Sequence, residues 1–388
     1  MQQTGKQNVI IYGLGNTIKD AFDYIKMRFS VIGCSDSNIE KKDTAQELRV
    51  LFVRPDELCD SEFDYILITS IYDDEIYNQL IENRNIPKEK VLRRQQWCRM
   101  IFQRSFGMMN QNKTFYVLSR PIHIRDGLFS FLFSFLEQLD FIDKKGYIPV
   151  IDMQNYRNQY LEEDKIGIEN AWEYYFNPVS EYRLEDVYKS ANVILGYDDP
   201  CYKTEYEKKY NIARMSELYQ RYIKYRPDVY SVVQREYVKL IDTSRKTLGI
   251  LYRGSDMSAL KLKNHPVQPT IDEMIYLTHK YMEEWHCERI FLSTEDGRAA
   301  DRMKAEFGAM LSCTNQRRFK DTGTEWLADI RFQRQDDKYL RGLEYLVTIE
   351  LLSKCDCFLA GICAGSVCAQ IMNNGKYQHM RMVDKGEY

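Results

Sequence analysis

Short apolar runs that stop at glycine or at charged residues recur along this chain and predict a set of buried strands. The clearest run is Leu248–Tyr252, which contains β-branched and aromatic residues and stops abruptly at Arg253. A strand that stops in this way delivers its next residues to the crevice where open α/β sheets bind ligands. Other apolar runs of this kind are Asn8–Tyr12, Phe63–Thr69, Arg289–Ser293 and Cys357–Ala360.

Segments with the apolar spacing of amphipathic helices alternate with these runs. One helix is predicted to begin at Thr270, where a threonine followed three residues later by Glu273 forms a capping box. Its buried face would consist of Met274, Leu277, Tyr281 and Trp285. The alternation predicts an α/β protein of three units: a Rossmann-like domain over residues 1–105, a lobe over residues 110–240 and a lobe over residues 241–388.

The first strand runs into a glycine turn that is typical of nucleotide-binding folds. Gly13 and Gly15 precede a predicted helix, and Asp36 follows the next strand about twenty residues later. Ile18 takes the place of the third glycine of the dinucleotide fingerprint. Two readings therefore stay open: a site for a nucleotide or a sugar nucleotide, and a Rossmann-like fold with an empty pocket that serves docking or dimerisation.

The composition is that of a globular protein and narrows the classes of partner. Hydrophobic residues make up 44% and charged residues 29% of the 388 positions, and the net charge of −3 does not suggest a nucleic-acid-binding surface. The most apolar segment, Leu128–Leu136, is too short to cross a membrane, which leaves only peripheral membrane association open. Ten cysteines without an apolar leader indicate reduced thiols and a cytoplasmic location.

Three strand ends in the last lobe carry groups that suit a nucleoside diphosphate. Arg253 offers a planar, permanently charged fork for phosphate oxygens. The run Thr294, Glu295 and Asp296 suits ribose hydroxyls or the edge of a base. Gly365 and Ser366 open the last predicted helix, whose N–H groups and hydroxyl can cradle a phosphate.

With these segments in view, the chain resembles the α-1,6-fucosyltransferase family, which comprises GT-B enzymes that use GDP-fucose. The resemblance extends from residue 125 to about residue 375 and leaves the N-terminal domain out. The segments that carry it are the glycine turn at Gly127, the aromatic segment Trp172–Ser180, the arginine motif Tyr252–Asp256, the acidic motif Ser293–Asp296 and the last motif Leu352–Cys368.

The resemblance implies two facing Rossmann-like lobes and a metal-independent, inverting transfer from GDP-fucose to a glycan acceptor. The absence of any Asp-x-Asp triplet from the sequence agrees with transfer without a metal. The sequence departs from the family pattern at Gly254, where a second arginine is usual, and at Met257, where a basic residue is usual. Lys261 falls near the position of the family's catalytic acid and cannot take that role as a cation.

The base that accepts the proton of the acceptor hydroxyl is predicted to be Asp256 or His265. Lys261 and Lys263 are candidates for contacts with the donor or the acceptor, and equally for an ordinary solvated loop. The sequence does not distinguish a surface polysaccharide from a glycoprotein or a small glycan as the acceptor.

Two other classes of function stay open. The first is an NAD-dependent enzyme that modifies a nucleotide sugar, with NAD on the Gly13–Gly15 turn. The second is a non-catalytic protein that binds a nucleotide or a glycan. Binding of GDP without turnover on any acceptor would favour the second class.

Overall fold

The computed structural model describes residues 6–15, 17–70, 72–121, 123–196, 211–254, 256–262, 265–320 and 325–388. The chain divides into two compact units. Unit 1 comprises residues 1–117 and 185–209, and unit 2 comprises residues 118–184 and 210–388. The division into three domains stays a prediction of the sequence.

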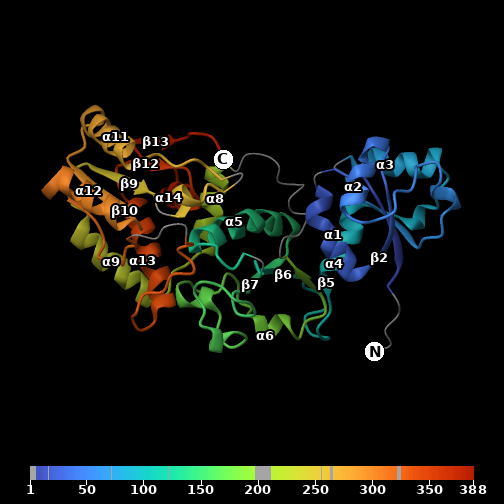
Figure 1. Cartoon of the computed structure of the whole chain (residues 1–388). Helices are drawn as coiled ribbons and strands as arrows, with labels where there is room; N and C mark the ends of the chain where they lie inside the picture. Colours follow the sequence, from blue (N-terminus) through green and yellow to red (C-terminus); the bar gives the residue numbers. More distant parts are fainter. Residues whose placement is uncertain are drawn as a thin grey trace. The chain divides into compact units, whose positions relative to one another are not determined.

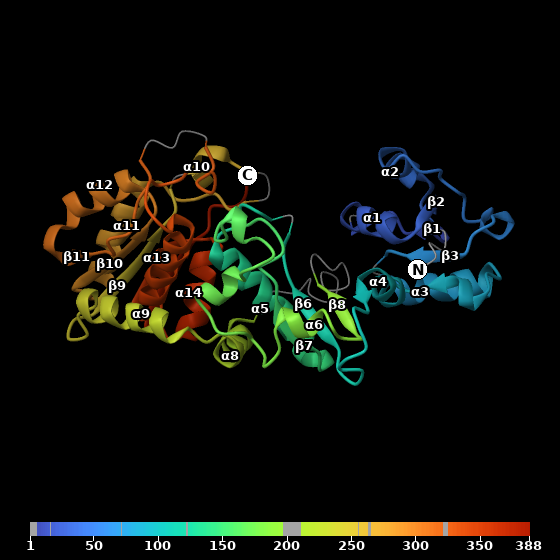
Figure 2. The same cartoon turned by 90° about the horizontal axis from the view of Figure 1, so that it is seen from below.

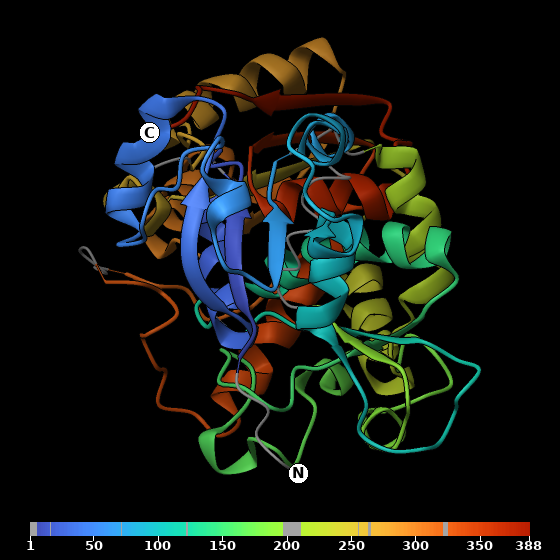
Figure 3. The same ribbon diagram turned by 90° about the vertical axis from the view of Figure 1, so that its right-hand side faces the viewer.

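Unit 1 begins with alternating strands and helices. They are β1 (Asn8–Tyr12), α1 (Thr17–Arg28), β2 (Ser30–Ser35), α2 (Lys42–Glu47), β3 (Tyr65–Ile68), α3 (Asp73–Asn78), β4 (Val91–Leu92) and α4 (Arg94–Phe102). The strands form a parallel sheet with the order β2-β1-β3-β4. Figure 3 shows strands of this sheet side by side in blue. The buried Trp97 of α4 fixes that helix to the sheet, because its Nε1 donates a hydrogen bond to the Ile68 carbonyl at 2.8 Å.

The remaining strands of unit 1 come from two stretches of the chain. They are β5 (Gln103–Arg104), β6 (Phe115–Leu118) and β8 (Val193–Leu195), and α6 (Leu184–Val187) precedes the last of them. Strand β8 lies between the other two, antiparallel to β5 and parallel to β6. Ile194 of β8 packs against the core cluster that α1 and α4 build.

Unit 2 opens with α5 (Leu128–Lys145) and β7 (Ile148–Ile151) and continues with α8 (Ile212–Tyr222) and α9 (Pro227–Leu240). Its larger part then alternates strands and helices: β9 (Thr247–Tyr252), α10 (Asp256–Leu260), α11 (Ile271–Glu284), β10 (Arg289–Thr294), α12 (Gly297–Phe307), β11 (Leu311–Ser312), α13 (Asp337–Leu352), β12 (Cys357–Gly361), α14 (Ala364–Asn373) and β13 (His379–Val383). The strands form a fully parallel sheet with the order β11-β10-β9-β12-β13. The α/β fold class predicted from the sequence is confirmed.

Helices cover both faces of the sheet of unit 2 (Figures 1 and 2). On one face, Met274 of α11 and Met303 of α12 pack against Ile250 and Leu292 of the central strands. On the other face, α13 approaches β9 at Gly249, where an added Cβ would lie 3.1 Å from the side chain of Leu352. Both faces of β9 are therefore buried, which explains why its sequence is an unbroken apolar run.

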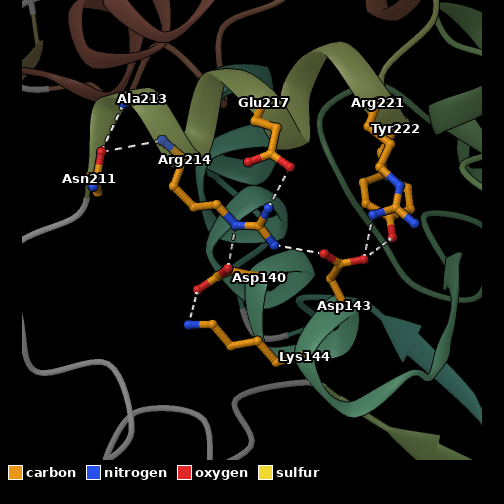
Figure 4. Close-up of polar contacts among 9 residues, drawn as sticks. All are labelled: Asp140, Asp143, Lys144, Asn211, Ala213, Arg214, Glu217, Arg221 and Tyr222. Carbon is orange, nitrogen blue, oxygen red and sulfur yellow. Dashed lines mark hydrogen bonds and ion pairs between the residues drawn. The ribbon is translucent and has the colours of Figure 1, made fainter.

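A network of charged side chains joins α8 to α5 (Figure 4). Arg214 donates from Nε to Asp140 and from Nη2 to Asp143, both at 2.7 Å, and its Nη1 lies 2.8 Å from Glu217. Asp140 is only 4% exposed, so its charge depends on these partners. Asn211 caps α8 by accepting hydrogen bonds from the N–H groups of residues 213 and 214.

The elements predicted from the apolar pattern agree with the structure in their order and type. The run expected at Leu248–Tyr252 is β9, which begins one residue earlier. The capping box at Thr270 is present, with Thr270 accepting from the Glu273 N–H and Glu273 accepting from the Thr270 N–H. Trp172 is buried, as expected for a core residue.

None of the helices in the described part of the chain combines the length and apolar character that a membrane span requires. Most of the cysteines in that part are free thiols. Cys98 is disulfide-bonded, so the expectation of reduced thiols throughout is wrong for this residue.

Candidate active site

A pocket in unit 2 lies at the carboxyl ends of β9 and β10, where parallel α/β sheets place their ligands. Arg253 follows β9, and Ser293 and Glu295 mark the end of β10. Gly127, the N-cap residue of α5, lines the pocket as well. The structure thus brings together three of the residues predicted from the sequence: Gly127, Arg253 and Glu295.

The pocket is strongly basic. Five arginines line it, but only two glutamates do. The arginines are Arg125, Arg253, Arg317, Arg334 and Arg341, and the glutamates are Glu295 and Glu344. Its aromatic lining comes from Tyr160, Phe319, Phe332 and Tyr345. A pocket with this lining favours a ligand that combines negative charge with a flat ring or an apolar face.

Two of these arginines are held by carboxylates. Arg334 donates from Nη1 and Nη2 to the two oxygens of Glu344, at 2.6 and 3.1 Å, and from Nε to Asp337 at 2.7 Å. Arg125 makes a comparable fork with Asp329, which its Nε and Nη2 approach to 3.0 and 2.9 Å. These pairs fix the positions of the two guanidinium groups at the wall of the pocket.

Arg341 holds the chain segment that forms one side of the pocket. Its guanidinium donates to the carbonyl of Leu327 at 2.8 Å and to that of Ile330. Leu327 lines the pocket together with Ala328. Burial lowers the pKa of Arg341, and Asp337, 3.3 Å away, acts in the opposite direction. Arg341 is therefore a structural support for this wall.

Arg253 lies close to an acid and to two tyrosines, of which Tyr160 is buried and Tyr345 partly buried. Its Nε is 3.7 Å from Oε1 of Glu295. Burial raises the pKa of Tyr345 well above its usual value, and the positive charge of Arg253 opposes that rise. Burial likewise raises the pKa of Tyr160. Both phenols thus stay protonated and can donate hydrogen bonds.

Tyr345 explains why position 365 is a glycine, but it leaves room for a Cβ at position 127. An added Cβ at Gly127 would lie 3.9 Å from its ring, and one at Gly365 would lie 3.4 Å from Cζ and closer still to the hydroxyl. Gly365 therefore leaves room for the Tyr345 hydroxyl next to the N-terminus of α14. A side chain at Gly365 would displace this ring from the pocket wall.

The hydroxyl of Ser366 is engaged locally. Ser366 is fully buried, accepts a hydrogen bond from the Cys363 N–H at 2.9 Å and donates to the Cys363 carbonyl at 2.8 Å. The residue does not line the pocket. Its contact with a donor phosphate stays a prediction, and it would require this hydroxyl to leave Cys363.

The acidic motif is divided between the pocket and the adjacent helix. Thr294 is buried, and its hydroxyl accepts a hydrogen bond from the Asp296 N–H at 3.1 Å. Asp296 caps α12 by accepting from the N–H groups of Arg298 and Ala299 at 2.8 and 3.0 Å. Of the three residues, only Glu295 lines the pocket.

Of the predicted bases and loop lysines, the two that the structure describes, His265 and Lys261, do not line the pocket. Lys261 is exposed and has a positive φ of 45°. His265 is exposed, and its carbonyl accepts a hydrogen bond from the Tyr388 N–H at 3.1 Å. The side chain of Asp256 and all of Lys263 lie outside the described residues. The assignment of the base stays a prediction.

The segment 314–320 is a part of the site that sequence reasoning missed. Gln316 donates from Nε2 to the Thr294 carbonyl at 3.0 Å, and the Phe319 N–H donates to the Glu295 carbonyl at 2.8 Å. The segment thereby lies along the end of β10 and brings Gln316, Arg317 and Phe319 into the pocket. It has no periodic apolar pattern, and its clustered basic residues were the only signal in the sequence.

A second hollow shares a wall with the pocket. Gln316 and Arg317 line both, and the hollow adds Lys304, Arg318 and Lys320. The Lys320 ammonium lies 2.6 Å from Asp301. The basic character of the pocket thus continues along the outer side of segment 314–320.

The glycine turn of unit 1 is engaged by its own chain. The Leu14 N–H donates to Oδ2 of Asp36 at 2.6 Å, and the Asn38 N–H donates to Oδ1 at 2.8 Å. Gly13 has a φ of +102°, and an added Cβ would lie 2.9 Å from Cβ of Ser70. Asp36, the acid that follows the second strand, thus holds the turn, and nucleotide binding by unit 1 stays a prediction.

No group of three or more histidine, cysteine, aspartate or glutamate side chains is arranged to hold a metal within the described ranges. The positive charge of the pocket comes from its arginines.

The comparisons with known proteins concern both parts of the chain. The family model "C2185-like, N-terminal" matches residues 5–92. No curated protein matches the sequence. The similar solved structures include NodZ α-1,6-fucosyltransferase soaked with GDP-fucose, with a TM-score of 0.45, 13% identity and coverage of 67% of this chain and 92% of that chain.

Two further structures are similar at lower scores. A mutant of Arabidopsis thaliana FUT1 in complex with GDP has a TM-score of 0.40 and 11% identity, covering 79% of this chain and 76% of that chain. POFUT1 in complex with GDP has a TM-score of 0.35 and 8% identity, covering 98% and 99% of the two chains.

Proposed function

We propose that this chain is a glycosyltransferase of the GT-B type that transfers fucose from GDP-fucose to a glycan acceptor. The observation that carries the proposal is the position of Arg253 at the end of β9, beside Glu295, in a pocket lined by five arginines. A guanidinium in this place suits the diphosphate of a nucleotide sugar. The aromatic lining suits the flat faces of a base or a sugar.

The proposed reaction is a single displacement with inversion. The acceptor oxygen forms a bond to the anomeric carbon of fucose, and the bond from that carbon to the diphosphate oxygen breaks. The electron pair of the broken bond leaves with GDP, and the acceptor proton passes to a base, for which Asp256 and His265 are the candidates. Arg253 would stabilise the charge that develops on the diphosphate.

Calorimetric titration with GDP, UDP, CMP and NAD tests the donor class, and transfer from GDP-fucose to a pool of glycans tests the reaction. We expect GDP to bind more tightly than the other three. GDP binding without transfer to any acceptor would point to a non-catalytic binding protein. Preferential binding of NAD would favour the alternative of an enzyme that modifies a nucleotide sugar.

A further inference from the structure

The residue after Arg253 is Gly254 and carries no second cation for the diphosphate. A Cβ added at Gly254 would lie 2.6 Å from both Cζ and Oη of Tyr252. Tyr252 belongs to the core cluster of the sheet and is only 6% exposed, so a side chain at Gly254 would have to displace a packed ring. The strand end of β9 therefore supplies one arginine only.

Three of the other arginines in the pocket already hold parts of the protein. Arg334 is paired with Glu344 and Asp337, and Arg125 with Asp329. Arg341 supports the carbonyls of residues 327 and 330. Recruiting any of them to a ligand would break contacts that shape the pocket.

Arg317 differs from these three. Its side chain is exposed, and within the described ranges no hydrogen bond or ion pair engages its guanidinium. Its backbone is nevertheless fixed, because Gln316 is bonded to the Thr294 carbonyl and Phe319 to the Glu295 carbonyl. The Gly297 N–H also donates to the Phe319 carbonyl at 2.8 Å. Segment 314–320 thus presents the available guanidinium of Arg317 next to Glu295, the acid that lies beside Arg253.

We propose that Arg317 binds the diphosphate of the donor as the second guanidinium of the site. The inference rests on the proposed function, because it names a donor contact within the same pocket. A nucleoside diphosphate carries a negative charge on each phosphate, and two arginines from different segments can approach it from two sides. Arg253 comes from the end of β9 and Arg317 from the segment beside the end of β10.

The test compares the binding of GDP and guanosine to Arg317→Ala, with guanosine measured by displacement of a fluorescent GDP analogue. We expect Arg317→Ala to weaken GDP binding by roughly tenfold to a hundredfold, as for loss of a charge-assisted hydrogen bond. Guanosine binding should stay unchanged because guanosine has no phosphate. Arg317→Lys should recover only part of the affinity, because it keeps the charge and loses the fork.

Two control variants remove the same charge elsewhere in unit 2. Arg235→Ala changes an exposed arginine of α9, and Lys304→Ala changes an exposed lysine that lines the second hollow and not the pocket. Both should bind GDP as the wild type does. The inference is wrong if Arg317→Ala binds GDP as well as Arg235→Ala, or if it loses GDP and guanosine equally. A loss for Lys304→Ala as large as that for Arg317→Ala would move the diphosphate to the hollow and also overturn it.

The wild-type titration separates this inference from the proposed function. If wild-type protein fails to bind GDP, the proposed function fails and the inference fails with it. If wild-type protein binds GDP and transfers fucose while Arg317→Ala behaves like the controls, the function stands and only the role of Arg317 is refuted.

Discussion

Nε of Arg253 and Oε1 of Glu295 lie 3.7 Å apart at the carboxyl ends of neighbouring parallel strands. The distance is that of an ion pair and is too long for a hydrogen bond. Glu295 therefore keeps the guanidinium of Arg253 near the pocket through charge attraction. This geometry suits an arginine that has to turn towards a phosphate.

Arg253→Ala should remove most of the transferase activity. The diphosphate gains negative charge as the sugar bond breaks, so a guanidinium binds the transition state more tightly than the ground state. Loss of one preorganised donor of this kind costs on the order of 3–4 kcal/mol, or roughly 10²–10³ in rate. Arg253→Lys should not rescue activity, because lysine lacks the planar fork. The measurement is transfer from GDP-fucose, with a thermal melt of each variant beside it.

Arg253 follows its strand and is not part of the core, so Arg253→Ala should melt close to the wild type. A stably folded Arg253→Ala protein that keeps more than about half of its activity, against the loss expected for such a donor, would remove Arg253 from the site. The same result would refute the proposed function.

Chelation should leave the activity intact. The proposed reaction neutralises the leaving diphosphate with guanidinium groups, of which five line the pocket. The experiment is an assay of fucosyl transfer after dialysis against EDTA, with and without added Mn²⁺. Loss of turnover in EDTA and its recovery with Mn²⁺ would show that a metal supplies the charge.

Arg214→Ala should destabilise unit 2 by about 2 kcal/mol, which corresponds to a fall in melting temperature of several degrees. Arg214 is 27% exposed and bridges Asp140 and Asp143, and Asp140 is almost fully buried (Figure 4). Removal of Arg214 leaves the buried carboxylate with Lys144 as its remaining partner in this network. Urea denaturation measures the change.

The matched control is Arg221→Ala on the same helix. Arg221 is 58% exposed and reaches Asp143 with Nη1 at 2.6 Å. An exposed pair of this kind contributes roughly 0–1 kcal/mol, so the control should lie close to the wild type. Equal losses for the two variants would mean that burial of Asp140 does not set the cost.

The same network predicts acid sensitivity through Asp143. The hydrogen bond from Arg214 is the main cause that holds the pKa of Asp143 below its usual 3.8, and Tyr222 and Arg221 add to it. A depressed folded-state pKa gives stability that is fully present above 3.8 and is lost as the pH falls through the folded-state pKa. The stability difference between wild type and Asp143→Asn should therefore be larger near pH ~7 than near pH ~3. A difference independent of pH would contradict this assignment.

The site residues that lie at the ends of strands were predictable from the sequence. The apolar run of β9 and the end of β10 are local patterns, and they place Arg253 and Glu295 at the same edge of a parallel sheet. Gly127 was predictable for a similar reason, because it directly precedes the apolar helix α5. In these cases the residue's neighbours in the chain determine its place.

The rest of the pocket depends on contacts between residues far apart in the chain. Arg317 enters it because Gln316 and Phe319 bond to the backbone at the end of β10, and no local period encodes such bonds. Arg125 is fixed by Asp329, more than two hundred positions later. Ser366 combines both cases. Its place at a helix N-terminus was predictable from the local sequence, but the hydrogen bond from its hydroxyl to the Cys363 carbonyl was not.

The two-part composition of unit 1 has a consequence for the order of events during synthesis. Strand β8 lies between β5 and β6, yet it is encoded after residues 118–184 of unit 2. A ribosome therefore releases the first part of unit 1 with two short strands that have not met their partner and with the Ile194 position of its core unfilled. Arrest peptides placed at successive lengths would hold the nascent chain on the ribosome for treatment with protease. The N-terminal unit should gain its final resistance to protease only after β8 has left the exit tunnel.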